Sequence, residues 1–261
     1  MFGLFKRKEK YLSDTEYWVY IPTAELPNQE AMMDFVIRGH ADSGHSSTIG
    51  PKEGILFSDI RLTIALVLRS KNPHVFRPDL IGEEVRTTKE LLECLADSVA
   101  LIKIRYISEE PLPDNRHLRM LPNLVVAAGT LGNACAVYDA QQETLSTFAN
   151  FVSELRRNPD PARPDFHVRS LWKPLSSGGQ AESRGLAKVG LRDFATKGMN
   201  ADEQVLVTNV VEEAARQVFA TARFPESVVI ESFNDRFRVV FDQKSKGTVT
   251  AVILRMHESA V

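Results

Sequence analysis

A long uncharged stretch lies in the middle of the chain, from Leu121 to Tyr138. Apolar residues recur there at helical spacing, at Leu121, Leu124, Val125, Ala128 and Leu131. This spacing predicts a buried helix that ends at Gly132-Asn133, followed by a short buried strand over 134–138. Its asparagines, glycines and proline make it a poor hydrocarbon segment. We therefore expect a helix packed on a sheet at the centre of the protein, and no membrane span.

The residues before this stretch alternate between strand and helix patterns. Strands are predicted where β-branched and aromatic residues concentrate or alternate with polar ones, at Tyr17–Ile21, Ile55–Phe57, Arg61–Arg69 and Val99–Ile107. The predicted strand Arg61–Arg69 is apolar enough to be buried on both faces. A helix is predicted from Pro27 to Arg38 with Gly39 ending it, and the capping box of Thr87 and Glu90 starts another.

The residues after the central stretch indicate another helix, two hairpins and a long final helix. Phe148, Phe151 and Leu155 have helical spacing. Strands are predicted at Phe166–Trp172 and Arg184–Leu191, around a Ser-Ser-Gly-Gly turn. Asn200 and Glu203 form a capping box before an apolar helical pattern that reaches Phe219. A terminal hairpin is predicted over 236–256, turning at 244–247.

Together these elements predict an α+β fold, with mixed or antiparallel sheets and helices packed on one face. The sequence divides into a flexible N-terminal segment (1–14), an α/β-type N-terminal half (15–158) and an α+β C-terminal half (165–261). The proline-rich segment Asn158–Pro164 marks the boundary. One continuous domain with a long surface loop fits the same pattern.

Composition indicates a cytoplasmic protein. The chain has 34 acidic and 32 basic residues and a pI near 6.3, so no overall field attracts it to nucleic acid or anionic lipid. Its two cysteines, Cys94 and Cys135, lie in apolar sequence, which is typical of reduced buried thiols. Phe2, Leu4 and Phe5 precede the basic run 6–10, which indicates a short membrane anchor or a solvated end, and we favour the solvated end.

The segment His40-Ala-Asp42-Ser-Gly-His45 is a candidate metal site, because two imidazoles and a carboxylate on a loop can converge on zinc or iron. Further ligands would have to come from His74, His117 or His167. The alternative is a solvated loop in which Asp42 caps the backbone. Ser46 beside His45 begins a nucleophile-elbow pattern, but Thr48 stands where that motif requires a second glycine.

Basic residues also concentrate between 169 and 197, where Arg184, Lys188 and Arg192 flank predicted strands. Such cations, next to a glycine turn, could bind a phosphate or another anion. Lysine and arginine on strands also prevent edge-to-edge pairing, which explains the same residues without any ligand.

The segment Arg184-Gly-Leu-Ala-Lys188-Val-Gly190-Leu-Arg-Asp193 resembles a signature near the end of a bacterial domain family of unknown function, Thr-x-Gly-Leu-x-Lys-Phe-Gly-x-Pro-Glu/Asp. The residues from Leu95 and those leading to Asp139 are similar to that family's helix–strand–helix–strand core, so the resemblance spans about residues 90–220. It implies a bacterial cytosolic accessory protein and assigns no activity, cofactor or catalytic residue. From the residues alone, Gly185 and Gly190 are expected at tight turns or close backbone approaches.

These patterns support three functional hypotheses. The first is a non-enzymatic binding or accessory protein that acts through protein–protein interaction and needs no cofactor. The second is a metal-assisted hydrolase that uses His40, Asp42 and His45, with Ser46 and His45 as a weaker catalytic alternative. The third is weak nucleic-acid or anion binding through Arg184, Lys188 and Arg192. We favour a protein partner, and the sequence does not define an oligomeric state.

Overall fold

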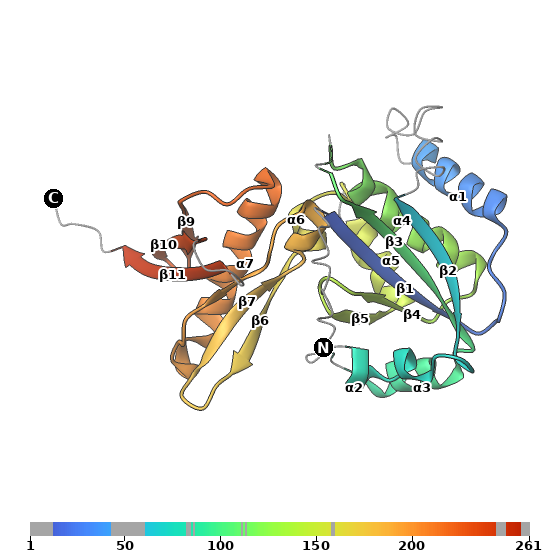
Figure 1. Cartoon of the computed structure of the whole chain (residues 1–261), viewed down its shortest axis with the longest axis horizontal. Coiled ribbons are helices and arrows are strands. Elements are labelled where there is room, and N and C mark those ends of the chain that lie inside the picture. Colours follow the sequence, from blue (N-terminus) through green and yellow to red (C-terminus); the bar gives the residue numbers. More distant parts are fainter. Residues whose placement is uncertain are drawn as a thin grey trace, which may run out of the picture.

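The protein is described from a computed structural model (Figure 1). It describes residues 13–42, 61–81, 85, 87–110, 112, 114–157, 160–243 and 249–256, and only the backbone of 39–42. Two sheets with helices packed on them make an α+β fold, as predicted. The predicted strand at Ile55–Phe57, the N-terminal anchor, His45, Ser46 and the turn at 244–247 lie outside the described residues.

The first sheet is five-stranded, entirely antiparallel and ordered β2-β3-β1-β4-β5. Its strands are β1 (Ser13–Ile21), β2 (Leu62–Leu68), β3 (Ala100–Ser108), β4 (Ala136–Asp139) and β5 (Thr144–Thr147). The central strand β1 places Val19 opposite both Ile102 of β3 and Val137 of β4. All three side chains are buried, because apolar residues alternate along strands that lie inside the sheet.

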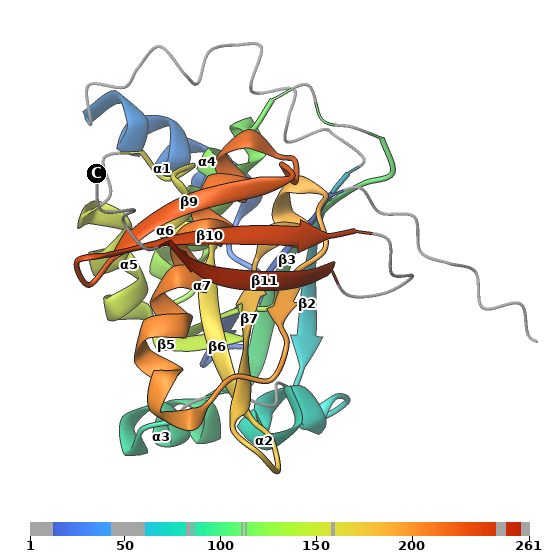
Figure 2. The ribbon, with the colours of Figure 1, turned by 90° about the vertical axis from the view of Figure 1, so that its left-hand side faces the viewer.

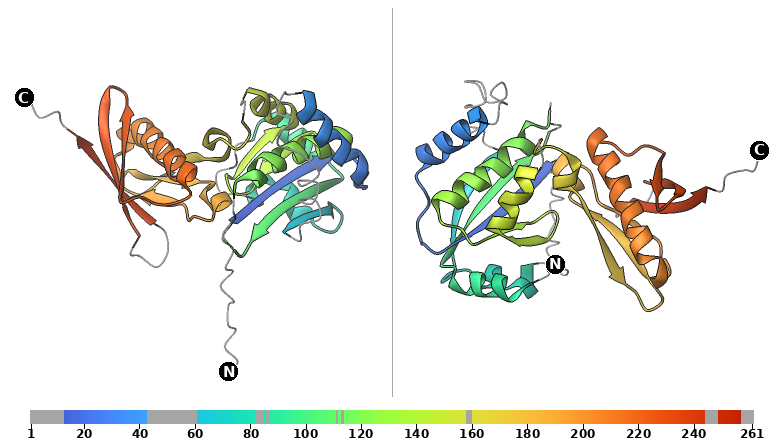
Figure 3. Two further views of the ribbon diagram at one scale, coloured as in Figure 1. Left: turned by 90° about the horizontal axis from the view of Figure 1, so that it is seen from above. Right: turned by 180° about the vertical axis from the view of Figure 1, so that it is seen from behind.

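Helices lie on both faces of this sheet. One face carries α1 (Gln29–Asp42), α4 (Arg116–Leu131) and α5 (Phe148–Arg157), which pack with Tyr17, Val19 and Ile102 (Figure 3). The opposite face carries the 3-10 helix η2 (Pro73–Phe76), α2 (Pro78–Ile81) and α3 (Lys89–Asp97), which surround Tyr20 and Tyr138. The uncharged central stretch therefore folds inward as α4 and β4, as predicted, except that Leu131 at the end of α4 is exposed. The helix α3 adds a layer beyond the one-sided packing expected.

The second sheet curves around one long helix (Figure 2). Its six strands are ordered β6-β7-β8-β11-β10-β9, and all pairs are antiparallel except β8 with β11. They are β6 (Arg169–Pro174), β7 (Gly179–Arg184), β8 (Phe194–Thr196), β9 (Ser227–Ser232), β10 (Asp235–Asp242) and β11 (Val249–Met256). The helix α7 (Gln204–Thr221) buries its valine and alanine face against them, and the short α6 (Pro164–His167) precedes β6.

Several predicted boundaries differ from the structure. The helix α1 continues past Gly39 to Asp42, and α3 is capped by Thr88, whose hydroxyl accepts from the Leu91 N–H at 3.3 Å, rather than by Thr87. The strand β2 lies at the edge of its sheet and is half-buried, because β3 is the only described strand that pairs with it. The predicted strand Arg184–Leu191 is wrong. Its residues after Arg184 form the 3-10 helix η3 (Leu186–Val189). The capping box before α7 is confirmed, within the 3-10 turn η4 (Ala201–Glu203).

The two cysteines are not reduced thiols. Cys94 in α3 and Cys135, immediately before β4, form a disulfide. The prediction failed because apolar neighbours indicate burial but say nothing about which thiols lie side by side. A cytoplasmic location rested partly on those thiols and stays a prediction. In the described part of the chain, no helix combines the length and the apolar character needed to cross a membrane.

Candidate functional site

The turn that carries Lys188 is built by two glycines. Gly185 and Gly190 flank η3 with φ angles of 106° and 79°, a left-handed conformation that favours glycine. A Cβ atom at position 185 would lie 2.0 Å from the His167 carbonyl oxygen, so no side chain fits there. The expectation of tight turns and close backbone approach at these glycines is therefore confirmed. The turn projects Lys188 out of the second sheet towards β1.

The Lys188 ammonium lies fully buried between the two sheets. Its Nζ donates to Asp139 Oδ2 at 2.5 Å and lies 3.5 Å from the Tyr17 hydroxyl and 3.4 Å from His167 Nδ1. Asp139 Oδ1 accepts from the backbone N–H groups of Gln141 and Gln142, so both carboxylate oxygens are bonded. Burial lowers the pKa of Lys188, and the Asp139 carboxylate opposes that shift. The cluster is a buried ion pair that joins the first sheet to the second.

The backbone of Lys188 makes a second connection. Its carbonyl oxygen accepts from the Ser13 hydroxyl at 2.8 Å and from His117 Nε2 at 3.0 Å. His167 Nε2 lies 2.6 Å from the Pro161 carbonyl and must donate to it, which leaves Nδ1 as an acceptor facing Lys188. Burial, with Lys188 nearby, lowers the pKa of His167 well below its usual value. Both histidines are therefore neutral. Together with Tyr17, Asp139 and Lys188 they form the joint between the two sheets.

His117 should make the stability of the protein sensitive to acid. Burial lowers its pKa from 6.5 to about 4, so the unfolded chain takes up a proton that the folded chain does not. The stabilisation is complete above pH 6.5 and is lost as the pH falls towards 4. In urea unfolding over that range, we expect wild type to lose about 3 kcal/mol more than His117→Gln.

The comparison between variants isolates this histidine. Burial raises the pKa of Asp193 to about 6. This shift changes the pH dependence of stability in the direction opposite to that of the histidines, but it does so equally in both proteins. His74→Gln alters an exposed histidine of η2 and serves as the control. Its stability should change with pH as that of the wild type does. Equal pH dependence in wild type and His117→Gln would show that the buried imidazole is not responsible.

A cavity of about 290 Å³ lies beside this joint, where the edge strands β5 and β6 approach each other. Asp139, Arg169, Glu212 and Arg216 contribute to its lining. Arg169 donates to the carbonyl oxygens of Gln142 and Glu143, and Arg216 forms ion pairs with Asp165, Glu212 and Glu213. Because these groups already bond to other parts of the chain, the cavity belongs to the contact between the sheets.

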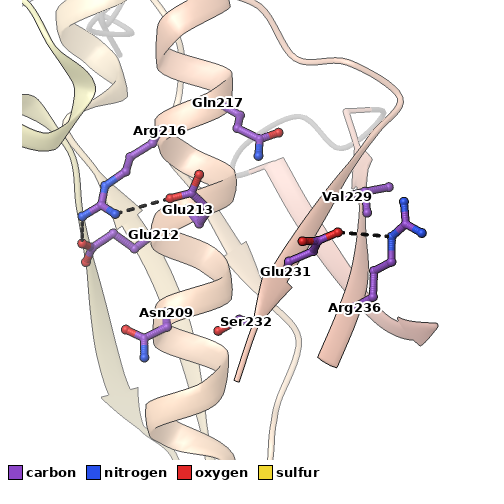
Figure 4. Close-up of a pocket in the computed structure, with 9 residues that line it drawn as sticks. All are labelled: Asn209, Glu212, Glu213, Arg216, Gln217, Val229, Glu231, Ser232 and Arg236. Atoms are coloured by element: carbon purple, nitrogen blue, oxygen red, sulfur yellow. Dashed lines mark hydrogen bonds and ion pairs between the residues drawn. The ribbon is translucent and has the colours of Figure 1, made fainter. Parts of the chain in front are cut away.

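Glu212 and Arg216 also line a larger open groove of about 610 Å³ between α7 and β9 (Figure 4). Asn209, Glu213 and Gln217 project from α7 on one side, and Val229, Glu231 and Ser232 of β9 lie on the other with Arg236 of β10. Within the described residues, β9 is the last strand of its sheet and pairs only with β10. The groove therefore combines an unpaired strand edge with side chains that both donate and accept hydrogen bonds.

The histidine segment proposed as a metal site is only partly placed. His40 and Asp42 fall in the last turn of α1, and only the backbone of that turn is described. The possible further ligands separate, because His74 is exposed in η2 while His117 and His167 are buried around Lys188. Across the described residues, no three histidine, cysteine, aspartate or glutamate side chains are grouped to hold a metal ion.

The three basic anion-site candidates do not gather on one surface. Lys188 is buried against Asp139, whereas Arg184 forms ion pairs with Glu182 and Glu143. Arg192 is exposed and also has an interaction partner. The side chains that Lys188 actually meets, Tyr17, Asp139 and His167, carried no local sequence signal, because they come from separate parts of the chain.

A scan against protein-family models found no match to this chain, and searches of curated proteins and of solved structures found none either. The resemblance of 184–193 to a bacterial family signature stays a prediction.

Proposed function

We propose that this chain is a non-enzymatic binding protein that captures an extended segment of a partner protein along β9. The observation that carries this proposal is the edge of β9 beside the groove of α7, which no other described strand covers. On an edge strand, alternate backbone N–H and C=O groups point away from the only neighbouring strand and can pair with an added one. The protein partner, rather than nucleic acid, agrees with the nearly balanced charge of the chain.

The sequence of β9 suits this role. Ser227-Val-Val-Ile-Glu-Ser232 is rich in β-branched residues and contains neither the lysine nor the proline that commonly blocks strand edges. Beside it, α7 offers the amides of Asn209 and Gln217 and the carboxylate of Glu213. An added strand would bond to the β9 backbone, and its side chains would meet these polar groups. Main-chain bonds would supply affinity and the helix would supply selectivity.

A displayed library of random peptides tests the proposal. Peptides enriched on the wild-type protein should bind about tenfold more weakly to Asn209→Trp, whose indole fills the groove. Gln204→Trp places the same side chain at another exposed position of α7 outside the groove and should leave binding unchanged. Bound peptide should also slow hydrogen exchange of β9 amides. Absence of enrichment, or equal binding to both tryptophan variants, would refute strand addition at β9.

A further inference from the structure

A second groove lies far from β9, on the helical face of the first sheet. Its volume is about 760 Å³, and it opens between α1, α4 and α5, the helices seen from behind in Figure 3 (right). Four half-buried apolar side chains line it, one from α1, one from α4 and two from α5: Phe35, Val126, Phe148 and Val152. Such a groove between helices provides a dry surface for a further helix.

The base of the groove is held rigid by a close helix contact. The Phe148 ring packs directly on the α4 backbone at Gly129, where a Cβ atom would lie 2.2 Å from that ring. The next turn of α5 is fixed by Phe151, which makes edge contacts with Tyr17 and Phe166. A preformed apolar surface loses little conformational entropy when a ligand binds.

The charge at the rim indicates what binds there. Arg156 and Arg157 end α5, line the groove and are exposed, and Glu154 on the same helix interacts electrostatically with Arg157. The rim therefore keeps a net positive charge among these three side chains. Two adjacent cations beside an apolar floor favour a ligand with apolar and acidic faces. The chain's own N-terminal sequence, with Lys6, Arg7 and Lys8, has the same sign of charge as this rim, which disfavours it as the ligand.

We propose that this groove binds an amphipathic helix of a partner protein, with apolar side chains on Val126, Phe148 and Val152 and carboxylates on Arg156 and Arg157. A helix fits better than a strand because the walls are themselves helices and present no strand edge. The site is separate from β9, so the protein would hold two segments at once. Binding here does not depend on strand addition at the other groove.

Three designed peptides of about 18 residues test this by fluorescence anisotropy with the full chain. One has leucines at helical spacing and glutamates opposite, the second replaces glutamate with lysine, and the third scrambles the first. The acidic helix should bind best. Val152→Glu should weaken it about tenfold, and the double variant Arg156→Glu, Arg157→Glu should reverse the preference towards the lysine peptide. Leu92→Glu, at an exposed site on α3, should leave binding unchanged.

The following outcomes would each overturn the proposal. Equal binding of acidic and lysine peptides, or binding that Val152→Glu does not change, would exclude this groove as the site. Binding that appears only after residues 1–12 are deleted would make the N-terminal segment the occupant. A dimer in sedimentation that Val152→Glu dissociates would make the occupant a second copy of the chain. Thermal unfolding of every variant establishes that it is folded before binding is compared.

Discussion

Replacing Lys188 with methionine should lower the free energy of unfolding by about 3–5 kcal/mol, because it leaves Asp139 buried without its cation. Asp139 is only 6% exposed, and Lys188 is the one cation that donates to its carboxylate in the described hydrogen bonds, beside the Tyr17 hydroxyl and two backbone N–H groups. Methionine keeps the length and apolar stem of lysine, so the change removes the charge and little volume. Urea unfolding at neutral pH measures the loss.

Two further variants separate the ion pair from general damage to the fold. Lys197→Met removes an exposed lysine and should change stability by less than about 0.5 kcal/mol. Combining Lys188→Met with Asp139→Asn removes both charges, while the asparagine carbonyl still accepts from Gln141 and Gln142. The double variant should lose clearly less unfolding free energy than the sum of the losses in the two single variants. A loss below about 1 kcal/mol for Lys188→Met would show that the pair is not buried as described.

The parts of the fold that the sequence predicted are those set by local patterns. Helix and strand periodicity located α4, β3 and the terminal hairpin, and the capping box at Asn200 located the start of α7. The 3-10 turn after Arg184 was mistaken for a strand because its apolar residues also fit alternation. The two glycines carried the better signal, since positive φ angles at 185 and 190 are incompatible with a strand.

The candidate sites depend on contacts between distant residues, which periodicity does not reveal. Lys188 and Asp139 are 49 positions apart, and Ser13 donates to Lys188 across 175. The basic residues near 188 suggested an exposed anion site, yet burial turned one of them inward as a joint. Both proposed binding grooves also arise where separate elements meet, α7 with β9 and α1 with α5 over α4. An exposed strand edge is invisible until the strand order is known.

Opening the disulfide between Cys94 and Cys135 should cost about 4 kcal/mol of unfolding free energy, from the entropy that the cross-link removes from the unfolded chain. The linked cysteines are 41 positions apart, a loop long enough for a large effect. The bond also holds α3 to the start of β4, so its loss should expose the side of the sheet around Tyr20 and Leu95. Guanidinium unfolding of the oxidised protein and of the double variant Cys94→Ala, Cys135→Ala measures the difference.

The double alanine variant also provides its own control for the reducing agent. Reductant should lower the unfolding midpoint of the wild-type protein to nearly that of the variant and leave the variant unchanged. Hydrogen exchange should then quicken first in α3, because its remaining described contacts are few: the buried Leu91 and Leu95, the Thr88 cap, and the bonds from Arg69 to its last carbonyls. Two freely reactive thiols in the native protein before reduction, or an unchanged midpoint after it, would contradict the disulfide and restore the reduced-thiol interpretation.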